Sequence, residues 1–160
     1  MRMTPLLRLT LLAATALSAA PHTAIAALGG TIESIAGDRV QMKASSRVMA
    51  VAPGSITTTP YTKHELLTPA GITVREYTRS DGRVFAVTWS GPVMPDLRQL
   101  LGPHFSTYLA TTDNERHGHA HRSIRTDELV VRSAGHMRAF SGVAYLRTLI
   151  PDGVSIDDLS

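Results

Sequence analysis

One run, Ile72–Leu101, constrains the fold more than any other part of the chain. It reads ITVREYTRSDGRVFAVTWSGPVMPDLRQLL. Two alternating segments flank Asp81-Gly82, which is a strong hairpin signal, so the run predicts two antiparallel strands. Pro95 and Asp96 then suit the first turn of a helix, where proline loses no hydrogen bond and aspartate complements the positive helix end. The run therefore predicts sheet followed directly by helix.

A third strand precedes this run and completes a three-stranded meander. It extends from residue 61 to residue 68, and Pro69-Ala70-Gly71 supplies the proline and glycine that a tight turn needs. In the last strand of the meander, alternation places Phe85, Val87 and Trp89 on one bulky face, which we expect in the core. The middle strand, with Glu76 among its apolar residues, is expected to be half-buried.

The helix after the meander carries the clearest apolar stripe in the chain. The stripe has the spacing of one helix face and comprises Leu97, Leu100, Leu101, Phe105, Tyr108 and Leu109. Gly102-Pro103 interrupts it, and an interior proline costs about 3 kcal/mol or more in a straight helix. We therefore expect a kinked helix whose apolar face packs on the sheet.

The remaining segments are assigned from shorter patterns. Residues 28–31 have the composition of a flexible lead-in, and 38–50 favour a helix capped by Asp38 over a strand. Residues 123–126 and 128–134 are strand candidates, Gly135 turns the chain, and Ser141-Gly142 predicts a bulge. The acidic tail is expected to dock through Val154 and Ile156.

These elements predict one α+β domain spanning residues 27–160. Its antiparallel sheet would have five or six strands, with the three-stranded meander at its centre and the kinked helix packed on one face. The preceding residues have the three parts of a signal peptide: basic Arg2 and Arg8, an apolar stretch over residues 9–20, and Ala24-Ile25-Ala26. Cleavage is expected after Ala26. The apolar stretch is shorter than the roughly 20 residues of a spanning helix.

Charge and composition exclude several classes of function. Without Arg2 and Arg8, 14 basic residues face 13 acidic ones, and the sequence has no basic run for nucleic acid. No further stretch suggests stable membrane insertion after cleavage. The chain has no cysteine, which excludes disulfides, a thiol nucleophile and thiolate metal ligands. The mature protein is expected in the periplasm or outside the cell.

The candidate metal ligands are three alternate histidines, His117, His119 and His121, in a polar loop. Alternate positions of an extended segment project to one side, where imidazoles can share a zinc, copper or nickel ion. A solvated loop rich in histidine is the simpler interpretation, because Gly118 and Ala120 make ordering costly.

Other catalytic patterns are incomplete. Ser90, Ser141, His104, His136 and Asp96 are the residue types of a serine hydrolase, but no G-x-S-x-G motif frames either serine. The carboxylates of Glu65, Glu76, Asp81 and Asp96 form no distinctive glycosidase pair. Arg75, Arg79 and Arg83 are consistent with either a small anion patch or an ordinary exposed face.

Several segments together resemble a family of exported proteobacterial proteins known as domain of unknown function 2844. They are Val74–Tyr77, Val84–Val87 with Trp89, Gly91-Pro92, Pro95–Leu97, Leu100–Gly102, Gly135–Phe140, Gly142 and Ala144-Tyr145. The resemblance covers nearly the whole mature chain. It implies a small signal-bearing protein and offers no catalytic residues to transfer. His117, His119 and His121 do not match the pattern.

These patterns favour an exported, non-enzymatic domain that binds a ligand or another exported protein, or serves a structural role. Two alternatives remain open. One is a periplasmic metal-binding protein that uses the loop from His117 to His121. The other is a cryptic hydrolase with His104 or His136 as its base.

Overall fold

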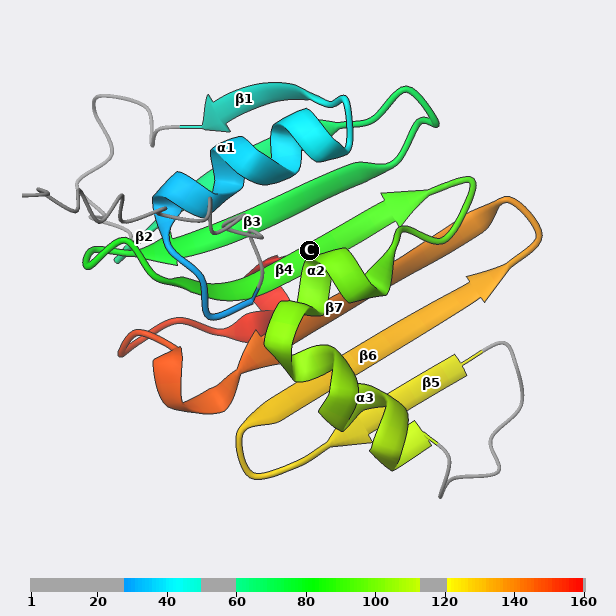
Figure 1. Ribbon diagram of the computed structural model, residues 1–160. Coiled ribbons are helices and arrows are strands. Elements are labelled where there is room, and N and C mark those ends of the chain that lie inside the picture. Colours follow the sequence, from blue (N-terminus) through cyan, green and yellow to red (C-terminus); the bar gives the residue numbers. More distant parts are fainter. Residues whose placement is uncertain (1–27, 50–59, 113–120, 160) are drawn as a thin grey trace, which may run out of the picture.

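The computed structural model describes residues 28–49, 60–112 and 121–159. They form one antiparallel seven-stranded sheet with the order β1-β2-β3-β4-β7-β6-β5 (Figure 1). The strands are β1 (Ser45–Met49), β2 (Tyr61–Leu67), β3 (Thr73–Arg79), β4 (Val84–Gly91), β5 (His121–Arg125), β6 (Leu129–His136) and β7 (Ala139–Leu146). The predicted α+β class and the central meander β2-β3-β4 are confirmed. The predicted five or six strands were too few.

The strand that was missed is β1. The prediction joined it to a helix over residues 38–50, whereas α1 (Ile32–Gln41) ends earlier and Lys43 turns the chain with a φ of 51°. Asp38 is therefore no N-cap: it lies late in α1 and is fully buried. β1 forms because it can pair along β2, and pairing between distant segments leaves no local sequence signal.

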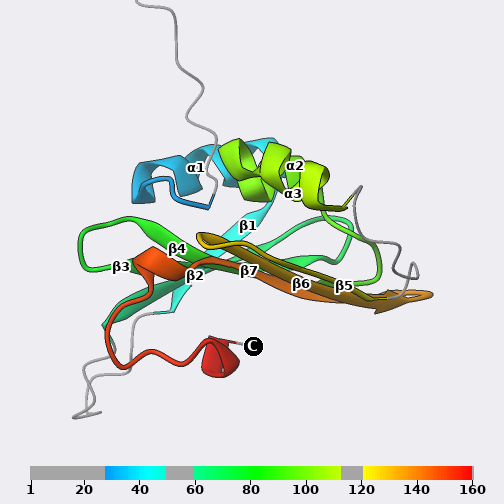
Figure 2. The same ribbon diagram turned by 90° about the horizontal axis from the view of Figure 1, so that it is seen from below.

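The helices that precede β5 in the chain lie on one face of the sheet (Figure 2). They are α1, α2 (Leu97–Leu101), η1 (Gly102–His104) and α3 (Phe105–Thr112). Asp96 caps α2 by accepting hydrogen bonds from the amides of Arg98 and Gln99. The single 3-10 turn η1 separates α2 from α3, as the predicted kink requires. No helix among the described residues is long and apolar enough to cross a membrane.

The lead-in before α1 belongs to the core, so its prediction as flexible was wrong. Leu28 is fully buried, and its amide donates to the carbonyl of Leu100 at 3.0 Å. The amide of Gly29 donates to the carbonyl of Val84 at 2.9 Å. These two bonds anchor the chain between α2 and β4 before α1 begins.

A bulge redistributes the side chains of β4. Tyr77 pairs with Ala86 and Thr78 with Val84, so Phe85 has no opposite residue and the alternation is broken. Phe85 packs with Tyr77 on the face opposite the helices, while Trp89 packs beneath the helices. The prediction that these two aromatic residues share one face was wrong. β3 is also more buried than predicted, because both of its faces are covered over part of its length.

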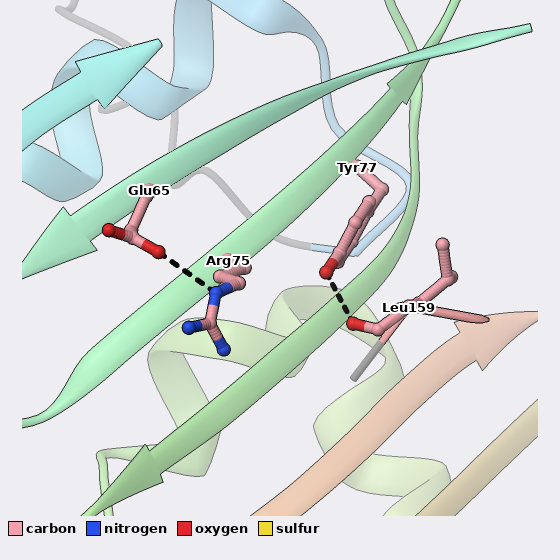
Figure 3. Close-up of polar contacts among 4 residues, drawn as sticks. All are labelled: Glu65, Arg75, Tyr77 and Leu159. Atoms are coloured by element: carbon pink, nitrogen blue, oxygen red, sulfur yellow. Dashed lines mark hydrogen bonds and ion pairs between the residues drawn. The ribbon is translucent and has the colours of Figure 1, made fainter. Parts of the chain in front are cut away.

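The face opposite the helices, called the open face below, is partly covered by the end of the chain. After η2 (Arg147–Leu149) the chain crosses beneath the sheet to η3 (Ile156–Leu159) (Figure 2). The Tyr77 hydroxyl donates to the Leu159 carbonyl (Figure 3). Val154 and Ile156 pack here as predicted, but the fully buried anchor is Leu159.

Beneath the helices, the indole of Trp89 packs closely against Gly142 of the neighbouring strand β7. A Cβ atom on Gly142 would lie 2.2 Å from Cζ2 of Trp89 and 2.7 Å from the carbonyl oxygen of Arg132. Pairing continues in register through Ser141 and Gly142, so the predicted bulge is absent from this pair of strands. The glycine is needed to seat the indole, not to bend the strand.

Gly142→Ala should therefore destabilise the protein by about 1–3 kcal/mol, the usual cost of overpacking a core. Chemical denaturation measures this loss. Ser141→Ala is the matched control, because Ser141 is exposed and its loss should stay within about 0.5 kcal/mol. Equal effects of the two variants would contradict the seating of Trp89 on Gly142.

Candidate functional site

The part of the open face that the C-terminal segment leaves uncovered forms a groove of about 660 Å³. Its floor follows one cross-strand row, in which Arg75 lies beside Thr88, Thr88 beside Val143, Val143 beside Arg132, and Arg132 beside Ser123. Because side chains of opposed residues lie on the same face of a sheet, the register alone brings these groups together. Four of the five come from interior strands.

A second row and the C-terminal segment complete the groove. Ser90 lies directly opposite Ser141, two residues along the strands from the first row and on the same face. Ile156 and Asp157 of η3 contribute to the lining from the covered side. The groove thus combines serine and threonine hydroxyls, guanidinium groups and a few apolar side chains.

Each of the two floor arginines meets a carboxylate at the edge of the groove. Arg75 Nε lies 2.9 Å from Glu65 Oε2, and the two terminal nitrogens of Arg75 point away from Glu65 (Figure 3). Arg132 Nη2 lies 3.3 Å from Asp157 Oδ1, with both side chains well exposed. Exposed ion pairs contribute little to stability, because water screens them. The guanidinium group of Arg132 is therefore open to a ligand, and that of Arg75, whose side chain is 28% exposed, is partly accessible.

A separate polar cluster is buried between the helices and the sheet. Gln99 Nε2 of α2 donates to Asp38 Oδ1 of α1 at 2.9 Å, and the carboxyl of Glu76 on β3 bonds to Asp38. Burial, then the negative charge of Asp38 and this hydrogen bond, raise the pKa of Glu76 to about 9. Glu76 is therefore protonated at neutral pH and donates to Asp38.

This cluster acts as a structural link rather than a reaction centre. Asp38 is fully buried and Glu76 is 1% exposed, so substrate has no access to the pair. The bonds tie α1, α2 and β3 together, and protonation of Glu76 avoids burying a second charge. Nearby, His64 Nε2 lies 3.2 Å from Thr78 Oγ1, and burial lowers the pKa of His64.

The predicted hydrolase residues do not assemble. Ser90 and Ser141 are on the open face, whereas His104 is in η1 on the helix side, where it lines another hollow of about 350 Å³. Asp96 caps α2, and His136 is exposed at the end of β6. Within the described ranges, no hydrogen bond joins either serine to a histidine.

The four predicted carboxylates are equally dispersed. Glu65 pairs with Arg75, Glu76 is buried on the opposite face, and Asp81 accepts the amide of Arg83 in the β3–β4 hairpin. Of the three arginines considered as an anion patch, only Arg75 lines the groove. Its partner there, Arg132, was not among the residues that sequence reasoning selected.

The predicted metal ligands fall largely outside the described residues. His117 and His119 lie outside them, and of His121 only the backbone, at the start of β5, is described. The described part of the chain contains no group of three or more potential metal ligands. Metal binding by this loop stays a prediction.

Comparison with known proteins gives one match. A family model described as Protein of unknown function (DUF2844) matches residues 24–159. Neither a curated protein nor a solved structure matches the chain.

The raised pKa of Glu76 predicts how stability depends on pH. The folded state holds a proton that the unfolded state releases above the ordinary pKa of 4.5. The free energy of unfolding should therefore fall as pH rises from about 4.5 to about 9, by up to roughly 1.4 kcal/mol per pH unit. Above that range this contribution levels off. Denaturation at several pH values measures the slope.

Glu76→Gln mimics the protonated carboxyl and should flatten this slope. Glu128→Gln is the matched control, because Glu128 is exposed, and it should keep the slope of the parent protein. An unchanged slope in Glu76→Gln would show that Glu76 is ionised in the folded state.

Proposed function

We propose that this chain is an exported, non-enzymatic binding domain. It belongs to the family described as Protein of unknown function (DUF2844). The groove on the open face is its ligand-binding surface. The observation that carries this proposal is the row from Arg75 to Ser123, which brings two guanidinium groups and the exposed Ser123 hydroxyl onto one accessible surface.

Two properties of the groove favour binding. Its volume of about 660 Å³ is within the usual range for small-ligand sites. Its floor is formed by β3, β4, β7 and β6, which are paired on both sides, so the ligand meets a preformed surface and little ordering is required. Little of the free energy of the contacts is therefore offset by the cost of ordering the site.

Fragment binding tests this role. In NMR titrations of residues 27–160 with a small-fragment library, hits should shift the amides of Thr88, Arg132 and Val143. Val143→Trp fills the middle of the floor and should abolish these shifts. Leu109→Trp, on the exposed side of α3, is the matched control and should leave them unchanged.

Two results would overturn the proposal. Fragments that bind elsewhere, or that still bind Val143→Trp, would remove the groove as the binding surface. Turnover of esters, peptides or glycans that disappears on one side-chain change would replace binding by catalysis.

Export rests on Arg2, Arg8 and the Ala24-Ile25-Ala26 pattern. In a Gram-negative host, cell fractionation should recover a protein whose N-terminal residue, read by Edman degradation or mass spectrometry, is Ala27. Ala24→Glu with Ala26→Glu should block processing. An unprocessed protein in the cytoplasm of the parent strain would contradict export.

A further inference from the structure

Resting on the proposed binding role of the groove, we infer that its ligand is an acidic oligosaccharide, an extended chain of sugar rings that carries carboxylates. Arg75 and Arg132 are paired with Glu65 and Asp157 through one nitrogen each, Nε and Nη2. The remaining guanidinium N–H groups of the two arginines can bind a further carboxylate. A planar guanidinium also matches a carboxylate with two parallel hydrogen bonds.

The spacing of the arginines favours an extended ligand. Arg75 is on β3 and Arg132 on β6, with β4 and β7 between them. Three steps of about 4.8 Å separate the backbones by roughly 14 Å. A single small anion would contact one guanidinium, whereas a chain with carboxylates along its length can contact both.

The groups between the arginines favour a sugar over a peptide. Ser90 and Ser141 offer hydroxyls, each of which donates and accepts, as sugar hydroxyls do. A bound peptide strand pairs with unpaired backbone at a sheet edge. The groove lies on the face of interior strands, whose backbone groups are already paired, so a peptide would lose that source of affinity there.

Asp157 occupies the position that a ligand carboxylate would take on Arg132. Arg132 Nη2 and Asp157 Oδ1 are 3.3 Å apart, and the side chains of Arg132 and Asp157 are 49% and 83% exposed. Replacing Asp157 by a ligand carboxylate as the partner of Arg132 therefore costs little free energy. Glu65 holds Arg75 through Nε alone, with the terminal nitrogens directed away from it (Figure 3). Glu65 thus orients the guanidinium of Arg75 for the ligand, and the guanidinium of Arg132 becomes available when a ligand carboxylate displaces Asp157.

Calorimetric titration with trigalacturonate tests this inference on the mature protein, residues 27–160. Binding should weaken as salt screens the charges. Arg75→Gln and Arg132→Gln should each raise the Kd about tenfold, the effect of losing one charged hydrogen-bonded contact. Asp157→Asn should leave the Kd unchanged or lower it. Arg138→Gln, on the exposed β6–β7 hairpin, removes the same charge outside the groove and should have no effect. Thermal unfolding confirms that each variant is folded.

The controls separate this inference from the proposed function. Maltotriose that binds as tightly as trigalacturonate would overturn the requirement for carboxylates. Hexaglutamate that binds more tightly, with the same dependence on both arginines, would replace the sugar by an acidic peptide. If neither sugar binds while fragments still compete for the groove and are blocked by Val143→Trp, the inference fails and the binding role stands. If Val143→Trp changes neither sugar binding nor fragment binding, both the inference and the proposed binding role of the groove are wrong. If Asp157→Asn weakens the binding of trigalacturonate as much as Arg132→Gln does, the Arg132–Asp157 pair has a structural role and is not displaced by the ligand.

Discussion

The pairing of β4 with β7 is the interaction on which the rest of the molecule depends. It joins strands β1–β4 to strands β5–β7, and no other strand pairing in the described sheet connects these two halves. Trp89 stabilises this seam because Gly142 leaves room for the indole directly across from it. The seam also aligns the two halves in register, and a slip of one residue would move every side chain of one half to the opposite face.

That register produces two faces of different character. Beneath the helices, the row through Val87 and Ala144 is apolar, and its one carboxyl neighbour, Glu76, is neutral at physiological pH. On the open face, the aromatic end around Tyr77 is covered by the C-terminal segment. The row from Arg75 to Ser123 carries two guanidinium groups and the Ser123 hydroxyl, which are stable in water and need no cover. The groove remains open because its residues do not require burial.

Features set by neighbouring residues could be predicted from the sequence. The Asp81-Gly82 hairpin, the cap at Asp96 and the kink at Gly102-Pro103 each follow from a few adjacent side chains and the backbone angles they allow. The α+β class followed from these elements together. The orientation of Phe85 did not, because a bulge depends on how β4 meets β3. Leu28 and Asp38 were misjudged for the same reason: their burial is created by α2, a distant segment.

The groove shows the same limit at the level of function. Arg75 was noticed as one of several charged residues on a hairpin, but nothing near it in the chain distinguishes it from Arg79. Arg79 meets Asp81 within its own hairpin. Arg75 meets Thr88 across the β3–β4 hairpin, but it joins Val143 and Arg132 only because β4 pairs with β7, a distant strand. A motif search looks for groups at fixed spacing along the chain. A site built across a sheet has fixed spacing between strands instead, so the register had to be known before its residues could be recognised as one surface.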